Sequence, residues 1–239
     1  MNKINFTLNN LKEGAVILID KPYKWTSFDV VNYIRKSVDV KIGHAGTLDP
    51  LATGLLILCT GKLTKKIDEY QGLDKEYTGN IILGQSTPSF DLETEITESL
   101  SVESITYDEI RAVAAKMIGV QNQIAPLFSA KKIDGERAYL KARRGESAEI
   151  KAREIEIKSF EILDIAKVEN TISVQFKVLC SKGTYIRAIA RDFALNLNNI
   201  AYLTDLVRTK IGDFNLKEAI SLHDFKAQFP VPFKYQKKQ

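Results

Sequence analysis

Apolar and polar positions along the chain alternate in ways that predict several strands. Residues 172–180 alternate strictly, which is the clearest strand signal in the sequence because successive side chains of a strand point to opposite faces. Two continuous apolar runs, residues 15–19 and 55–59, have strand length and predict buried strands. Further strands are expected over residues 77–84 and 203–211.

A different spacing predicts helices. Thr26 or Ser27 can cap a helix in which apolar residues recur every three or four positions. Thr106 and Glu109 have the spacing of a capping box, and the helical pattern that follows them ends at Gly119.

A third helix is expected after Gly183, with an apolar face that leaves Arg187 and Arg191 together on another face. A short helix is also expected over residues 136–144.

Strands and helices are mixed without the regular alternation of a doubly wound fold or a barrel. We therefore expect a mixed α/β fold. The chain has 239 residues, 44% of them hydrophobic, with no internal repeat or obvious linker. This size favours one domain with two lobes, covering residues 1–239.

Composition excludes several classes of protein. The two cysteines, Cys59 and Cys180, lie in apolar runs, and the two histidines are far apart, so a disulfide framework or a zinc site is not expected. No phosphate-binding glycine loop and no hydrolase nucleophile motif occurs, so no metal and no cofactor are expected. The N-terminus lacks a signal-peptide pattern and no apolar run could cross a bilayer, which favours a cytoplasmic protein without membrane contact.

Charge is segregated along the chain. Residues 131–153 hold eight basic and four acidic residues, an excess equal to the net charge of +4 for the whole chain. Residues 91–109 hold seven acids and no base. A compact basic segment suits a phosphate backbone, but a solvated helix face is an equally good interpretation of charge alone.

One carboxylate, Asp49, lies in a segment that local rules keep out of regular structure. The segment from Gly43 to Gly54 reads GHAGTLDPLATG, and Pro50 biases Asp49 towards an extended conformation. A strand-like run follows directly and would anchor the loop. By itself such an aspartate more often satisfies turn amides than performs chemistry.

Five ordered segments resemble the bacterial tRNA pseudouridine-55 synthases, the TruB family. They read VILIDKP, GHAGTLDPLATG, DKEYTG, QIAPLFSAKKIDGERAY and CSKGTYIRAIARD, and the resemblance covers about residues 14–214. It implies the pseudouridine synthase fold, a central mixed and mostly antiparallel sheet flanked by helices, in two lobes with the active-site cleft between them.

The resemblance also implies an activity that needs no cofactor. These isomerases detach a uracil from its ribose at N1, rotate the base and rejoin it through C5. Asp49 matches the essential carboxylate, which would attack the ribose, attack the base or remove a ribose proton. The matching pocket residues are a cation that pairs with the aspartate, two rings that flank the base and an apolar wall: Arg187, Tyr77, Tyr185 and Leu206.

The implied partner is tRNA, bound at its T-arm by a monomer. His44 matches a histidine that helps to hold the RNA open, and Lys21 matches a basic-loop position near the active site. A basic RNA-docking insertion is expected at about residues 124–153, with these candidate RNA contacts: Lys132, Arg137, Arg143 and Arg144. Many family members carry a C-terminal PUA domain, which we expect to be absent because the chain ends soon after the last recognisable strand.

Two other functions fit the same scaffold. A non-catalytic tRNA-binding or tRNA-folding protein is disfavoured by the intact set of Asp49, Tyr77, Tyr185 and Arg187. A guide-RNA-dependent pseudouridine synthase is disfavoured by the short C-terminus.

Overall fold

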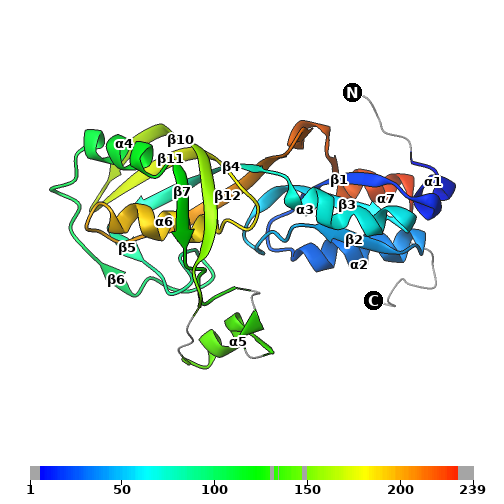
Figure 1. Cartoon of the computed structure of the whole chain (residues 1–239), viewed down its shortest axis with the longest axis horizontal. Coiled ribbons are helices and arrows are strands. Elements are labelled where there is room, and N and C mark those ends of the chain that lie inside the picture. The colour runs from blue at the N-terminus through cyan, green and yellow to red at the C-terminus, as the bar shows by residue number, and fades with distance from the viewer. Residues whose placement is uncertain (1–5, 130–131, 134, 147–149, 231–239) are drawn as a thin grey trace. The chain divides into compact units, whose positions relative to one another are not determined.

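The computed structural model describes residues 6–129, 132–133, 135–146 and 150–230. The chain forms two compact units, Met1–Lys75 with Val207–Gln239, and Glu76–Leu206. Figure 1 shows the elements of both units in chain order. No helix in these ranges combines the length and hydropathy needed to span a membrane.

Strand β3 (Thr53–Thr60) is central to the first unit. It pairs antiparallel with β1 (Val16–Lys21) and with β2 (Ile42–Ala45), and parallel with Val207 and Arg208 of β12 (Ala201–Ile211). Two short strands extend this sheet: β14 (Ile220–Ser221), parallel to β1, and β13 (Phe214–Asn215), antiparallel to β12.

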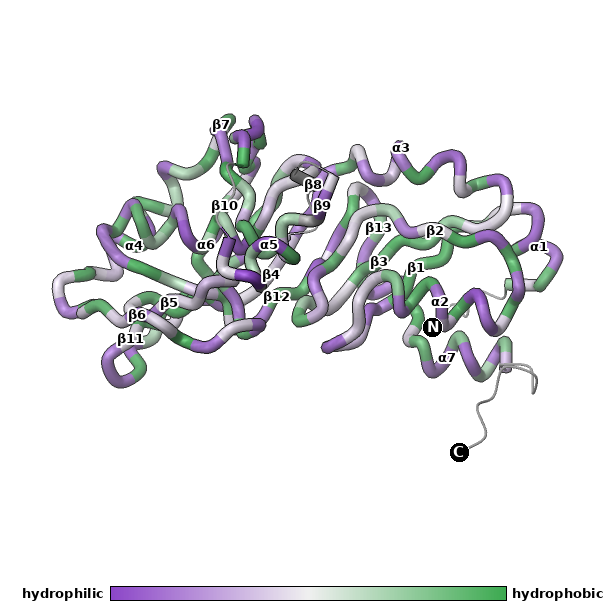
Figure 2. The backbone as a smooth tube through the Cα atoms, turned by 90° about the horizontal axis from the view of Figure 1, so that it is seen from below, coloured by the Kyte–Doolittle hydropathy of each residue, from purple (hydrophilic) through white to green (hydrophobic). Residues whose placement is uncertain are grey.

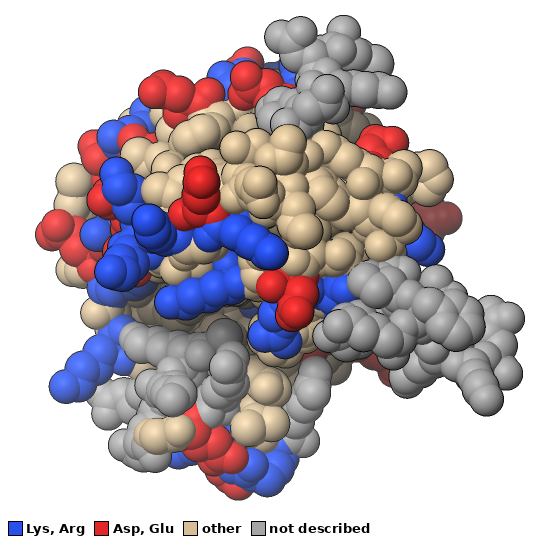
Figure 3. Space-filling view, turned by 90° about the vertical axis from the view of Figure 1, so that its right-hand side faces the viewer, with Lys and Arg blue, Asp and Glu red and all other residues tan. Residues whose placement is uncertain are grey.

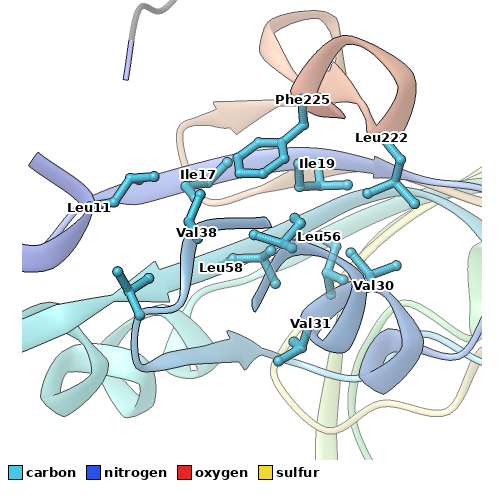
Figure 4. Close-up of a cluster of buried hydrophobic side chains, with 12 residues drawn as sticks. Leu11, Ile17, Ile19, Val30, Val31, Val38, Leu56, Leu58, Leu222 and Phe225 are labelled. Carbon is cyan, nitrogen blue, oxygen red and sulfur yellow. The ribbon is translucent and has the colours of Figure 1, made fainter. Parts of the chain in front are cut away.

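Both faces of β1 and β3 are covered, which explains their continuous apolar runs. One face packs against three helices: α1 (Leu8–Glu13), α2 (Ser27–Val38) and α7 (Leu222–Gln228). Figure 4 shows this core, with Phe225 and Leu222 above the strand residues. The opposite face is lined by two short helices, η1 (Gly61–Lys66) and α3 (Ile67–Gly72). Figure 2 shows the resulting hydrophobic stretches in β1 and β3.

The second unit is built on strands in the order β12, β4, β11, β10 and β7. Their bounds are Lys75–Leu83 for β4, Thr171–Cys180 for β11, Arg153–Val168 for β10 and Gly119–Gln123 for β7. Helices α4 (Tyr107–Lys116) and α6 (Ile186–Leu195) pack in this unit. Phe193 of α6 contacts Phe160 of β10 with ring centroids 5.5 Å apart.

The remaining elements of the second unit are small. They are two hairpins and one short helix: β5 (Gln85–Ser86) with β6 (Glu98–Ser99), β8 (Lys132–Ile133) with β9 (Glu136–Arg137), and α5 (Ala138–Arg143). A last 3-10 turn, η2 (Leu216–Glu218), belongs to the first unit.

The mixed sheet flanked by helices is confirmed, as are the strands and helices expected from apolar spacing. The capping residues predicted for α2 and α4 are also confirmed: Thr26 and Thr106 both accept from the third residue of their helix. The helix expected over residues 136–144 is shorter than its pattern, because Glu136 and Arg137 pair with β8 as a strand instead.

Candidate active site

The loop that carries Asp49 is shorter than the glycine-rich motif suggested. Gly43 and Gly54 both lie in strands, β2 and β3, so the irregular stretch runs only over residues 46–52. Asp49 lies within it, outside any helix or ladder, as expected. Its carbonyl accepts from Ala52 N at 3.1 Å, and its side chain is half-buried.

Two elements of the first unit hold the residues on either side of Asp49. Ser27, the first residue of α2, accepts from Leu48 N at 2.9 Å and donates to Leu48 O at 3.3 Å. Lys21, the last residue of β1, donates from Nζ to Pro50 O at 3.3 Å. Asp49 is therefore flanked by two backbone positions that are each tied to a regular element.

A third support comes from Arg208 of β12, which no sequence pattern had marked. Its guanidinium is 1% exposed and donates to three carbonyls of the same loop and its exit, at 2.7 to 3.5 Å: Leu55 O, Gly46 O and Thr47 O.

Lys21 lies inside the fold rather than at its surface. The residue is fully buried, and its ammonium donates also to Trp25 O at 2.6 Å and Pro22 O at 3.0 Å. Burial lowers the pKa of Lys21 to about 8, an effect that Asp49 opposes and Arg208 reinforces. This placement favours support of the Asp49 loop over a direct phosphate contact.

His44 lies in β2, opposite Leu58 of β3. Its Nδ1 is buried and finds no hydrogen-bond partner among the described residues. Burial, followed by the nearby charge of Arg208, lowers the pKa of His44 and so favours the neutral ring.

The other expected pocket residues belong to the second unit. Tyr77 lies in β4, Leu206 in β12 and Arg187 in α6, with Tyr185 at the helix N-cap as expected. Tyr77 is buried, whereas Tyr185 and Leu206 are partly exposed.

Arg187 is buried, not an exposed helix residue. It is 4% exposed, donates to Ser89 O at 3.0 Å, and lies 3.5 Å from a carboxylate oxygen of Asp91. Sequence reasoning missed Asp91, because it is the first residue of a long acidic stretch and no local signal separates it from the other acids.

Tyr185 is held by a residue that the sequence also did not mark. Its backbone N donates to Gln123 Oε1 at 2.9 Å, and its carbonyl accepts from Gln123 Nε2 at 3.2 Å. Gln123 ends β7 and is buried. Since the N-cap has no side-chain cap of its own, this amide fixes the start of α6 from a neighbouring strand.

Comparison with known proteins shows to which family the chain belongs. The profile of the TruB family of pseudouridylate synthases, N-terminal domain, matches residues 34–186. A protein of Phocaeicola vulgatus called tRNA pseudouridine synthase B is 49% identical over 90% of this chain and 93% of its own length. The protein of that name in Flavobacterium johnsoniae is 51% identical over 88% of this chain and 93% of its length. The chain belongs to the TruB family.

Solved structures agree with this membership. A Cbf5-Nop10-Gar1 complex contains a chain that matches at a TM-score of 0.68 and 27% identity, over 92% of this chain and 55% of that one. An H/ACA RNP bound to a substrate RNA containing 2'-deoxyuridine matches at a TM-score of 0.66 and 26% identity, over 90% and 53% of the two chains.

The candidate RNA contacts of this TruB family member are only partly described. The side chains of Lys132, Arg137 and Arg143 lie outside the described residues. Arg144 is exposed and forms ion pairs with Glu136 and Glu146, each at 2.7 Å. Figure 3 shows one face of the molecule, on which Lys and Arg side chains gather with a few acids among them.

In the described ranges, no group of three or more His, Cys, Asp or Glu side chains could hold a metal ion. The loop that carries Asp49 presents a carboxylate between two tied backbone positions. Such a group can act as nucleophile or as base, and the supports around it limit how far it moves.

Proposed function

We propose that this protein converts uridine to pseudouridine in the T-loop of tRNA, at position 55, with Asp49 as the essential carboxylate. Family membership gives the reaction class, isomerisation of uridine to pseudouridine. The curated relatives at 44 to 51% identity are tRNA pseudouridine synthases, which supports tRNA as the substrate. Such an enzyme acts where tRNA is, in the cytoplasm, and as a monomer.

The observation that carries the assignment of Asp49 is the bracing of its loop. Leu48 and Pro50 are each tied to a separate element, by Ser27 and Lys21. A side chain that only had to satisfy turn amides would not need supports from two elements, whereas a reacting group must be held in position.

The reaction is balanced without a cofactor. The bond between C1′ and uracil N1 breaks, a bond between C1′ and C5 forms, and the hydrogen on C5 leaves as a proton while N1 gains one. A nucleophile or base that returns to its starting state is sufficient. In this proposal Arg187 is the cationic partner of the carboxylate.

The base must leave its stack to reach a carboxylate, as it does in other enzymes that modify bases. Tyr77 and Tyr185 supply rings for the displaced uracil, and Leu206 supplies an apolar wall. His44 holds the opened RNA, as its match to the family histidine implies.

Release of tritium from tRNA labelled at uracil C5 tests the proposal. Unmodified transcript should lose tritium with the wild-type protein, and Asp49→Asn should lower the rate at least about 10²-fold, because a removed general base costs about 10²–10⁴-fold and a removed nucleophile costs more. Retained activity in Asp49→Asn contradicts the role of Asp49.

A transcript in which position 55 is cytidine tests the site. It should release no tritium above background, and an isolated T-arm hairpin should react nearly as well as the whole tRNA. Release from the cytidine transcript at the normal rate would show that another uridine is the target. Activity of the purified protein without guide RNA separates it from guided synthases, and multiple turnovers separate it from a folding factor.

A further inference from the structure

Arg208 is a buried cation whose partners are all carbonyl groups. It is 1% exposed, and among the described residues no carboxylate pairs with it. Removing a charge from water is costly unless the protein compensates it closely. An apolar side chain at this position would avoid the free-energy cost of removing a charge from water. The stability of the core alone therefore does not explain a guanidinium here.

The carbonyls bound by Arg208 lie on both sides of Asp49. Gly46 O, at 3.1 Å, and Thr47 O, at 3.5 Å, precede it, and Leu55 O, at 2.7 Å, follows it. The planar guanidinium has donors in a fixed fork. One side chain therefore sets the distance between the start of the loop and its exit.

The backbone of Arg208 contacts the same loop exit. Arg208 is the parallel partner of Gly54 in the β12 and β3 ladder. Gly54 has a φ of 99°, and a Cβ built on it would lie 2.5 Å from Arg208 O and 2.9 Å from Arg208 N. Only glycine permits this approach, so the guanidinium is anchored at short range to the element that it holds.

A second buried cation reinforces the arrangement. Lys21 donates to Pro50 O, next to Asp49 in sequence. Asp49 is the carboxylate that most favours the charged form of Lys21, while burial and Arg208 oppose it. Two buried cations, Lys21 and Arg208, therefore hold the loop that carries the Asp49 carboxylate.

We propose that Arg208 is a positioning residue for Asp49. It acts through the loop backbone, by holding the carbonyls on both sides of Asp49, and not by contact with the RNA. This inference rests on the proposed role of Asp49. Displacement of the carboxylate by about 1 Å would cost about 100-fold in rate, while the surface that binds RNA would be unchanged.

The test compares Arg208→Met and Arg208→Lys in single-turnover tritium release and in tRNA binding by filter retention. Arg208→Met should lower the single-turnover rate about 100-fold and leave the tRNA Kd within about threefold. Arg208→Lys keeps a donor and the charge without the fork, so it should recover part of the rate and remain about tenfold below wild type.

Leu222→Ala is the matched control. Leu222 lies in the core that α2 and α7 form over β1 and β3, and its truncation lowers stability by creating a cavity. Its single-turnover rate should equal that of wild type below its melting temperature. A rate loss as large as that of Arg208→Met would attribute the effect to stability alone and overturn the proposal.

Other outcomes are equally decisive. A folded Arg208→Met with the wild-type rate, or with a rate loss matched by a weaker Kd, overturns the proposal. If Arg208→Met does not fold, Arg208→Lys decides, since a wild-type rate in that variant shows that the fork has no positioning role. Asp49→Asn is measured in parallel: its retained activity would defeat the proposed function itself, whereas an inactive Asp49→Asn beside a fully active Arg208→Met defeats only this inference.

Discussion

Burial of Lys21 changes the role that a basic residue near the candidate site can have. In the sequence it stands next to Asp20 and Pro22, and a surface lysine would be a natural phosphate contact. In the fold its ammonium is fully buried and donates to three carbonyls. Residue type and position could be predicted, but the direction of the side chain could not, because it depends on carbonyls that other elements supply.

Replacing Lys21 by Met should remove a pH dependence from stability. Burial lowers the pKa of Lys21 to about 8 in the folded protein, whereas a lysine in an unfolded chain titrates near 10.4. Between these two values the unfolded chain binds more protons, so the free energy of unfolding contributed by this lysine rises with pH.

Urea unfolding from about pH 7 to about pH 10 measures this contribution. The difference in unfolding free energy, wild type minus Lys21→Met, should increase across the upper half of that range. Lys24→Met, which removes an exposed lysine of the same turn, controls for the loss of one charge. A difference that stays flat or falls with pH would show that Lys21 is not a desolvated ammonium.

Asp91 gives a second prediction for a single residue. It forms an ion pair with Arg187, whose Nε lies 3.5 Å from Asp91 Oδ2, and both side chains are nearly excluded from water. Loss of one partner of a buried ion pair costs about 3–5 kcal/mol. Asp91→Asn should therefore lower the free energy of unfolding by up to about that amount, and it should also slow tritium release if Arg187 serves the reaction.

Asp91→Asn is best compared with Glu95→Gln, an exposed change in the same acidic stretch. Surface changes of this kind are within about 0.5 kcal/mol of neutral. Equal stability and equal rates for the two variants would mean that the pair with Asp91 does not matter in solution.

At the scale of elements, those with strong local signals were predictable. Helices α2 and α4 each begin at a threonine that caps the first turn, and β11 alternates along its whole length. These signals depend on residues that are close together in the sequence. Helix α6 was only half predictable: its apolar face is in the core, but its arginine face is covered too, with Arg187 on Ser89 and Asp91. That cover comes from a loop nearly a hundred residues earlier, which periodicity cannot reveal.

The start of α6 depends on Gln123, and this dependence can be measured. In Gln123→Ala the backbone N–H of Tyr185 loses its partner, while its carbonyl keeps the bond from Ile189 N. A buried backbone group left unpaired costs about 1–3 kcal/mol, so the variant should lose about that amount in urea unfolding. Gln121→Ala, on the same strand, removes one contact to Met117 O and should cost less. A larger loss in Gln121→Ala would remove the special role assigned to Gln123.

At the scale of the whole molecule, the sequence predicted a mixed sheet but not the path of the chain. The first unit combines Met1–Lys75 with Val207–Gln239. Its sheet is completed by the parallel pairing of β12 with β3 and of β14 with β1. These partners are more than 150 residues apart, and nothing in either local pattern specifies the other. For the same reason, Arg208 could not be recognised as a support of the Asp49 loop.

The segregation of charge is a property of the whole chain, and salt dependence tests it. Residues 131–153 carry the entire net positive charge. If Lys141 and Lys151 contact phosphates, Lys141→Gln with Lys151→Gln should reduce the slope of log K against log salt by about 1.4, at about 0.7 for each contact on single-stranded RNA.

The control variant is Lys116→Gln with Lys167→Gln, which replaces two exposed lysines of the same unit. Both double variants lose the same net charge, so long-range attraction falls equally. Equal slopes for the two variants would therefore assign RNA binding to net charge alone, whereas a smaller slope only in the first assigns it to phosphate contacts in the basic segment.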